Sequence, residues 1–422
     1  MDILLINCIV YIATSLFFLL KNKELNIYTF LWFAYAFTAF MAYYCVKEGY
    51  YYNVDTSLGT KLNAIPYIAN YIFTFIVLSP FYRYNVANCA FHTTPGLSNK
   101  YKIDVIKFSM IIFVVYGVLC FTGVLVAASI GYAEIYEASH EAGKDLVALS
   151  NPILATIYNW GGIYYEVFRP LVVVLLAEQL IFRQFKGKLL YAGLVVCFLP
   201  YIFSAIGYAN RGGIFFIFIE MTFLYLFLQK QLPTKVKKRI IVAGCLILTV
   251  LLFYSVLISN SRFVEGEGKQ EDTFGATSRY FGEQMANLGD MYYGKVKHFG
   301  MGETFFPEFS DAPKFNSLGD FFTYWNKKLG VDIDYMGTLF GDCYIQFDLV
   351  GAFIFIILLV CIWKRCFFKS NIFMVPLVYY YFRVFAVGGL FGYGFYDART
   401  HLFCGVLILL CYWLKSKEVK RI

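Results

Sequence analysis

The chain has 422 residues, of which 59% are hydrophobic and 15% are charged, whereas soluble domains carry roughly 25% charged residues. So few charged side chains cannot cover the apolar residues of a chain this long, which excludes an ordinary soluble globular protein. The net charge of +8 comes from short basic clusters between apolar runs, so it indicates orientation in a membrane and argues against nucleic-acid binding.

Apolar runs typical of membrane-spanning helices recur along the whole chain, because a span takes about 20 mainly apolar residues to cross about 30 Å of hydrocarbon. We predict an all-α fold, a polytopic transmembrane bundle of about eleven spans. The predicted spans are Ile3–Leu20, Ile27–Cys45, Ile65–Tyr82, Val105–Ile130, Leu154–Phe182, Leu189–Gly207, Ile214–Gln229, Ile240–Ile258, Phe340–Trp363, Ile372–Phe391 and His401–Leu414.

Basic residues fall on alternate connections between these spans, for example at Lys21 and Lys23, and from Lys230 to Arg239. Since Lys and Arg are retained in the cytoplasm, the N-terminus is predicted outside and the C-terminus in the cytoplasm. Residues 260–339 then form a large extracytoplasmic loop of short helices and turns. The predicted divisions are spans one to eight in 1–259, this loop in 260–339, and spans nine to eleven with a cytoplasmic tail in 340–422.

Six arginines lie toward the predicted outer ends of the spans. Charged groups at membrane depth are costly and usually face a cavity or pair with a partner. A guanidinium binds phosphate in a planar, two-pronged way, so a shared outward pocket would fit a polyanionic head group. The alternative is structural ion pairing, of Arg169 with Glu166 and of Arg399 with Asp397. The predicted substrate-binding residues are Arg169, Arg211, Arg262, Arg279, Arg383 and Arg399.

The fifth predicted span is unusually long and contains Gly161, Gly162 and Pro170. A proline inside a helix removes a hydrogen bond, so the segment is either a broken helix that lines a cavity or a long tilted span. The four histidines have no metal-ligand spacing, and the sequence predicts neither a metal site nor a cofactor.

Two local motifs accompany this architecture, the turn YANRGG at Tyr208–Gly213 and the run GDCYIQFDLVG at Gly341–Gly351. With the aromatic-rich spans and the late outer loop, the chain resembles the Wzy-type polymerases of O-antigen or oligosaccharide repeat units. The resemblance covers most of the chain as topology. The second motif departs from the family pattern, because Leu349 and Val350 stand where a glycine often follows the aromatic pair.

The resemblance implies a glycosyltransferase of the bacterial inner membrane that makes O-antigen, capsule or exopolysaccharide from glycans linked to undecaprenyl pyrophosphate. Membrane lipids and a chain-length regulator are the further partners that it implies. Pyrophosphate is a good leaving group, so outer cations would stabilise it, with Arg211, Arg279 and Arg169 favoured, while one base accepts a proton. The base is predicted among Glu283, Asp342, Asp397 and His401; His401 is alternatively an ordinary interfacial histidine.

Two other functions fit the same sequence features. A lipid-linked oligosaccharide flippase would be equally hydrophobic and basic, although an alternating-access carrier does not require so large an outer loop. An O-antigen ligase shares the late loop but would transfer finished glycan to a lipid A core or protein. Loss of a ligase would leave polymer on the carrier lipid, whereas loss of a polymerase would leave single repeat units.

Overall fold

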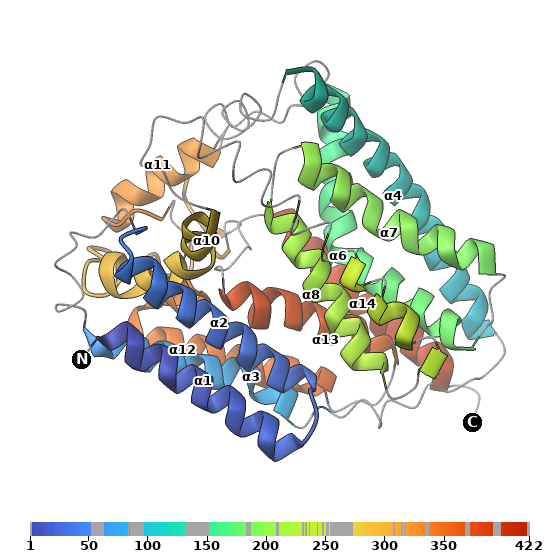
Figure 1. The fold of residues 1–422 in the computed structure, drawn as a ribbon. Helices are drawn as coiled ribbons and strands as arrows, with labels where there is room; N and C mark the ends of the chain where they lie inside the picture. The colour runs from blue at the N-terminus through green and yellow to red at the C-terminus, as the bar shows by residue number, and fades with distance from the viewer. Residues whose placement is uncertain are drawn as a thin grey trace. The chain divides into compact units, whose positions relative to one another are not determined.

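A computed structural model of the chain describes residues 2–51, 63–82, 84, 97–130, 152–182, 187–207, 211–229, 232, 234–235, 237–242, 244–246, 249, 253, 273–306, 309–313, 315, 318–333, 337–367, 372–390 and 398–419. Helices and turns make up this part of the chain, and no strand occurs in it (Figure 1). The chain divides into two compact units. Unit 1 comprises Met1–Tyr84, Phe263–Phe368 and Tyr381–Ala398, and unit 2 comprises Asn85–Arg262, Lys369–Tyr380 and Arg399–Ile422.

Six described helices are long and apolar enough to cross a bilayer. They are α1 (Ile3–Asn22), α2 (Ile27–Lys47), α3 (Ala64–Tyr82), α4 (Leu97–Ile130), α6 (Pro152–Phe182) and α12 (Leu339–Phe367). Large apolar side chains on several of them point outward, such as Ile111 on α4 with 65% of its surface exposed. Such surfaces need lipid as their solvent, so these helices fit a transmembrane protein.

In unit 1, α1, α2 and α3 pack through aromatic rings. The ring of Tyr11 on α1 lies between Trp32 and Tyr35 of α2 and Tyr71 of α3, with centroid distances of 6.0, 6.1 and 5.3 Å. The Tyr11 hydroxyl is 3.3 Å from the Thr74 hydroxyl, so its polar end is satisfied inside the cluster. Aromatic area and internal hydrogen bonds together hold these three helices side by side.

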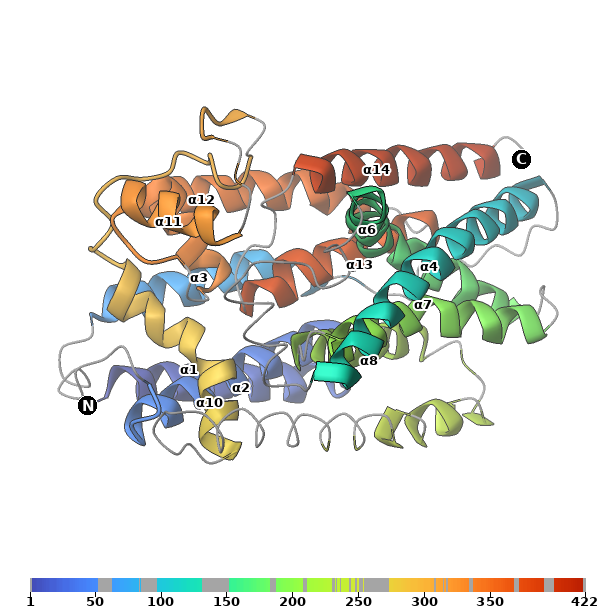
Figure 2. The same cartoon turned by 90° about the horizontal axis from the view of Figure 1, so that it is seen from above.

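Helix α10 (Thr273–Asn287) lies across α2 in both views of unit 1 (Figures 1 and 2). Its contact face carries Gly275 and Gly282, and a β-carbon on Gly282 would overlap the backbone of Met41 and Ala42. Gly289 continues the same seven-residue spacing into a π-helical turn, η3 (Leu288–Tyr292), where it contacts Tyr67 of α3. Glycine at these positions lets two helix backbones approach closely, which larger residues would prevent.

Helix α12 is interrupted at Asp348, whose backbone has φ 61° and ψ 178°. Such an interruption frees carbonyl groups in the preceding turn. The carbonyl of Ile345 accepts a hydrogen bond from the amide of Gly300 at 3.1 Å, and the carbonyl of Gln346 accepts one from the amide of Met301 at 2.7 Å. The chain before α12 is therefore attached to the helix by backbone bonds, and residues 349–367 beyond the interruption are long enough to cross a bilayer alone.

The remaining helix of the segment before α12 is α11 (Leu318–Leu329). Unit 1 also holds a π-helical turn, η6 (Phe382–Val387), and a short 3-10 turn, η7 (Gly388–Leu390). Within unit 1, the segment 273–338 contacts the beginning of α1, the end of α2 and the beginning of α3, for example through Asn7 and Met285, Tyr44 and Phe274, and Tyr67 and Gly289. These ends were all predicted to lie on the outer side. We call the described part of 273–338 the cap segment.

Unit 2 contains α4 and α6 together with α7 (Gly187–Gly207), α8 (Arg211–Leu228), η5 (Ile372–Met374), α13 (Val375–Tyr381) and α14 (Ala398–Val419). The last residue of α13 and the first residue of α14 belong to unit 1. Helix α4 packs against α6 and α7, and α7 packs against α8. Gly117 of α4 receives the ring of Pro200 on α7, and the α6 pair Gly161 and Gly162 receives Tyr116 of α4. Small residues again permit the close packing.

The structure decides between the two predicted forms of the fifth span. Helix α6 runs unbroken through Gly161, Gly162 and Pro170, so it is a long helix of about 46 Å and not a broken one. The interrupted helix is α12, in the segment predicted as the ninth span. Predicted spans six, seven, ten and eleven also correspond to described helical segments, and the predicted eighth span falls mostly outside the described residues.

Candidate functional site

The most deeply buried charge in unit 2 is Arg169 of α6, which has no exposed surface. Its Nη2 lies 2.9 Å from Oε2 of Glu220 on α8, and Glu220 is only 1% exposed. The angles of this contact are not those of a hydrogen bond, and the described structure gives none of the three guanidinium nitrogens a hydrogen-bond acceptor. Arg169 and Glu220 are therefore held by charge, with the directional donors of the arginine unused.

Aromatic rings enclose the guanidinium on two sides. Its carbon lies 4.4 Å from the ring centroid of Tyr201 on α7 and 5.2 Å from that of Tyr165 on α6. The Tyr165 hydroxyl donates to the carbonyl of Cys197, so this ring is fixed in place. Electron-rich ring faces stabilise a desolvated cation, and a planar guanidinium suits them better than an ammonium. We call Arg169, Glu220, Tyr165 and Tyr201 the arginine centre.

The local sequence of α6 places further polar groups at the arginine centre. Glu166 lies one helical turn before Arg169, and its charge interacts with that of the arginine. Pro170 follows directly, and a proline cannot donate to the carbonyl four residues earlier, which is that of Glu166. Glu166 and this carbonyl therefore lie near the arginine centre as additional acceptor groups.

A second buried ion pair lies elsewhere in unit 2. Lys102 Nζ of α4 donates to Oε1 of Glu178 on α6 at 2.7 Å, and both side chains are about 5% exposed or less. The ammonium also lies 4.8 Å from the ring centroid of Phe373. This pair differs from the arginine centre because its ammonium is already engaged in a short hydrogen bond. We interpret it as structural.

Helix α14 brings two more predicted residues to unit 2. Phe403 packs edge-on against Trp160, Tyr164 and Phe168 of α6, with centroid distances of 5.8, 5.9 and 6.1 Å. Arg399 lies over the ring of Trp160 at 5.8 Å, and half-buried His401 lies two residues before Phe403. Arg211 is the first residue of α8, the helix that supplies Glu220. Unit 2 therefore groups three predicted arginines and one predicted base on α6, α8 and α14.

The other predicted residues lie elsewhere. Arg279 and Glu283 are half-buried on α10, half-buried Asp342 lies in the first turn of α12, and half-buried Arg383 lies in η6, all in unit 1. Arg262 and Asp397 fall outside the described residues. The single pocket of six arginines thus stays a prediction. For Arg169 the ion-pair alternative holds, but the paired carboxylate is Glu220 of α8, whereas the sequence suggested Glu166.

A second polar group lies in unit 1, at the junction of the cap segment and the end of α2. The Tyr51 hydroxyl donates to the side-chain oxygen of Asn287 and lies 3.5 Å from Oδ2 of Asp290. Burial raises the pKa of Tyr51 above its usual range, and the carboxylates of Asp290 and Glu283 raise it further. Tyr51 is therefore a hydrogen-bond donor at physiological pH. The predicted base Glu283 is close enough to this group for its charge to act on the Tyr51 hydroxyl.

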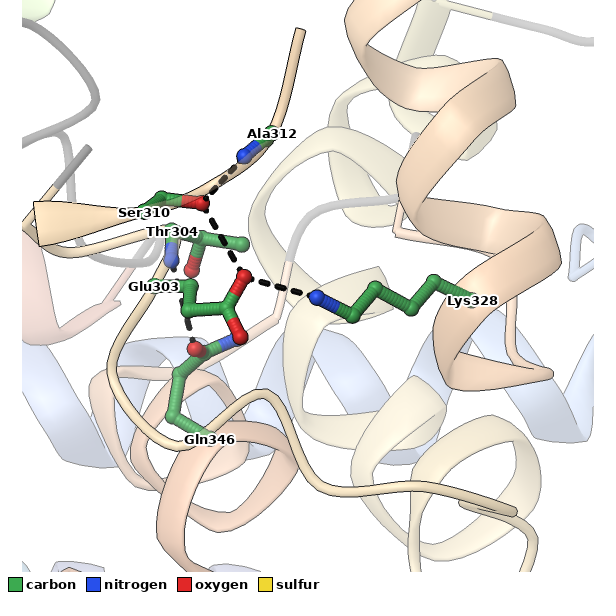
Figure 3. A network of polar contacts seen from close by, with 6 residues as sticks. All are labelled: Glu303, Thr304, Ser310, Ala312, Lys328 and Gln346. Carbon is green, nitrogen blue, oxygen red and sulfur yellow. Dashed lines mark hydrogen bonds and ion pairs between the residues drawn. The ribbon is translucent and has the colours of Figure 1, made fainter.

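The cap segment also contains a polar network that ties its turns together (Figure 3). Oε2 of Glu303 accepts from Nζ of Lys328 at 2.7 Å and from the Ser310 hydroxyl at 3.0 Å. The Lys328 bond holds the pKa of Glu303 below its usual value, and the Ser310 bond adds to this effect against the opposing effect of burial. The amide of Thr304 also donates to the side-chain oxygen of Gln346 on α12, so the network joins the cap turns to one another and to this helix, and we interpret it as structural.

Sequence reasoning missed three residues of these groups. Glu220 is a lone carboxylate inside a predicted span, and such an isolated charge predicts a buried partner of opposite charge. Asp290 and Tyr51 carried no such signal, because both stand among other polar residues near predicted loops. In the part of the chain that the structure describes, no group of three or more metal-ligating side chains occurs.

Comparison of the chain with models of protein families, with curated proteins and with solved structures finds no match.

Proposed function

We propose that the protein is a membrane glycosyltransferase that polymerises oligosaccharide repeat units linked to undecaprenyl pyrophosphate. The observation that carries the proposal is the arginine centre. We propose that the buried Arg169 guanidinium, which is paired with the carboxylate of Glu220, exchanges that carboxylate for a phosphate group of the carrier lipid. The resemblance in architecture to the Wzy-type polymerases is the second support. Transport of the same lipid-linked units and ligation of finished glycan stay the alternatives.

The proposed reaction joins two lipid-linked glycans. A hydroxyl of the incoming unit attacks the anomeric carbon of the growing chain, and the bond from that carbon to the pyrophosphate oxygen breaks. The hydroxyl proton passes to a base, and undecaprenyl pyrophosphate leaves with the electron pair. Arg169, Arg211 and Arg399 of unit 2 are proposed to stabilise the leaving pyrophosphate, because charge develops on its bridging oxygen.

The base is proposed from the four candidates of the sequence, with His401 first because it lies on α14, which also carries Arg399 and packs on α6. An imidazole is the side chain that most often serves as a general base. Glu283 is the next candidate, since its carboxylate is half-buried and acts on the hydroxyl of Tyr51 in unit 1. Asp342 and Asp397 complete the set. The membrane orientation proposed is the one from the sequence, with the N-terminus and the cap segment outside the cytoplasm.

Replacement of Arg211 by alanine tests the function. We expect the protein to stay in the membrane at its normal level, while long glycan chains disappear and single repeat units accumulate on the carrier lipid. Gel ladders of the glycan and immunoblots of membranes measure both. Ladders of normal length would contradict the role of Arg211, and full-length polymer left on the carrier lipid would favour a ligase.

A second variant tests the arginine centre itself. Arg169→Lys keeps the charge opposite Glu220 but removes the planar two-pronged donor, so we expect shortened ladders with normal amounts of membrane protein. Lys102→Arg is the matched control, because it changes a buried ion pair of the same unit to which no substrate role is assigned. Equal losses of the ladder in both variants would show that the effect is structural.

The transporter alternative has one observation in its favour. Ionisable residues wholly buried in a membrane unit, such as Arg169 with Glu220, are common in proton-coupled carriers. If the protein is a flippase, the purified protein in proteoliposomes should move lipid-linked units between the leaflets, and Glu220→Gln should stop this movement. Polymer formation from lipid-linked units by the same purified protein would reject it as the main function.

A further inference from the structure

Unit 1 contains a groove of about 620 Å³ between α1 and α3, next to the beginning of α2. Its volume is within the range of roughly 300–1,000 Å³ that small-molecule sites occupy. The described residues that line it are Ala13, Thr14, Phe17, Phe18, Lys21, Tyr28, Tyr71, Phe75, Ser79 and Tyr82. It takes no part in the arginine centre or in the polar groups of the cap segment.

The walls of the groove are mainly apolar, and the hydroxyl groups of Thr14, Tyr71 and Ser79 in them are already bonded. The Thr14 hydroxyl lies 2.8 Å from the carbonyl oxygen of Val10 and 2.8 Å from the Tyr71 hydroxyl. The Ser79 hydroxyl donates to the carbonyl of Ile76 at 2.8 Å. The rest of the lining is mostly aromatic carbon. A ligand with hydroxyl or amide groups along its length would lose hydrogen bonds to water on entering, whereas a hydrocarbon chain would not.

One end of the groove carries a cation. Lys21 lies in the last turn of α1, and its Nζ is 5.2 Å from the ring centroid of Tyr82 and 5.7 Å from that of Phe17. None of the ion pairs between described residues involves Lys21. Tyr82 is the last residue of α3, so the charged end lies where α1 and α3 both end, and the apolar walls extend toward the middle of the helices.

This arrangement of charge and apolar surface matches a membrane lipid in its normal orientation. Phosphate groups lie at the interface where spans end, and acyl chains extend toward the bilayer centre. We propose that the groove binds one acyl chain of an anionic phospholipid and that the phosphate of this lipid lies against Lys21. The site is independent of the proposed polymerase activity, because it needs neither glycan nor pyrophosphate.

The test measures lipid bound to the purified full-length protein. Protein in detergent is titrated with phosphatidylglycerol or phosphatidylcholine, and bound lipid is counted by native mass spectrometry. We expect phosphatidylglycerol to bind more tightly. Lys21→Gln should weaken it about fivefold, the factor that corresponds to about 1 kcal/mol for one basic residue at an anionic surface. Ala13→Phe should block the groove, and the protein should still fold because Ala13 is exposed.

Lys47→Gln is the matched control. Lys47 is an exposed lysine in the last turn of α2, and its Nζ lies over the ring of Tyr43 at 5.7 Å, as Lys21 lies over Phe17. Full binding in this variant supports the proposal. Equal weakening by Lys21→Gln and Lys47→Gln would overturn it, as would equal binding of phosphatidylcholine. Displacement of phosphatidylglycerol by equimolar undecaprenyl phosphate would also overturn it, by assigning the groove to the carrier lipid.

Discussion

The interior of unit 2 and the cap segment of unit 1 are held together by different interactions. In unit 2, buried ion pairs connect the helices, with Arg169 joined to Glu220 and Lys102 to Glu178. In the cap segment, glycine contacts and backbone hydrogen bonds connect it to α2 and α12, and its ion pair of Lys328 with Glu303 is partly exposed. A charge that is buried among helices has no water to return to, so loss of its partner is costly, whereas water can replace a partner in the partly exposed cap pair.

The largest effect is expected from removing one charge of the arginine centre. Glu220→Leu leaves Arg169 buried without its carboxylate partner, so the free energy of unfolding should fall by about 3–5 kcal/mol. Adding Arg169→Met removes the stranded charge and should restore most of this loss. Unfolding in detergent, followed by circular dichroism, measures both. If the double variant is less stable than Glu220→Leu, charge is not what holds the pair.

The cap segment should be most sensitive at its glycine contact with α2. Gly282→Ala places a β-carbon into the backbone of α2, and overpacking of this kind costs about 1–3 kcal/mol. Gly405→Ala on α14 is the control, since its β-carbon would meet open space and alanine favours a helix. Protease digestion of the cap segment should increase in the first variant alone. Equal digestion of both would contradict the close contact.

The interruption of α12 predicts a change of the opposite sign. Asp348 has a positive φ that glycine adopts more easily, so Asp348→Gly should raise the free energy of unfolding by about 1 kcal/mol. Asp342→Gly, in the first turn of the same helix, should lower it by up to about 1 kcal/mol. Thermal unfolding midpoints compare the two variants. Destabilisation by both would mean that the helix is regular at Asp348.

The smallest effect is expected at the exposed pair of the cap segment. Lys328→Gln should cost no more than about 1 kcal/mol at pH 7. Because Lys328 lowers the pKa of folded Glu303, its contribution exists above the pKa of the unfolded carboxyl and disappears as the pH falls through the lowered value. The difference between wild type and variant should therefore shrink in acid. Lys327→Gln, its neighbour on α11, should show no such pH dependence.

Much of the helical fold was predictable from apolar runs. The predicted spans from Ile3, Ile27 and Ile65 begin within one residue of α1, α2 and α3, because each run is bounded by polar residues that begin or end a helix. The interruption at Asp348 was not predictable. The carbonyl groups before it bond to the amides of Gly300 and Met301, which are distant in sequence, and periodicity reports only local preference.

The candidate site was predictable only in part. Arg169 was found because a cation in an apolar run is rare, but its partner on α8 was not, since pairing across helices leaves no local pattern. Arg211, Arg399 and His401 were found as polar residues at span ends, and the structure adds that their helices belong to one unit with α6. The Tyr51 group depends on the contact of α10 with α2, which the glycine spacing implies only once the two helices are known to pack.

The backbone bonds between residues 300–301 and α12 constrain how the protein is made. Gly300 and Met301 leave the ribosome before Ile345 and Gln346, so their amides have no final acceptors until the following helix has been synthesised and inserted. Insertion of α12 therefore completes the attachment of a segment that was synthesised earlier. A nascent chain truncated after Thr338 lacks both acceptors and should expose that segment to proteases, even though every residue of the segment itself is present.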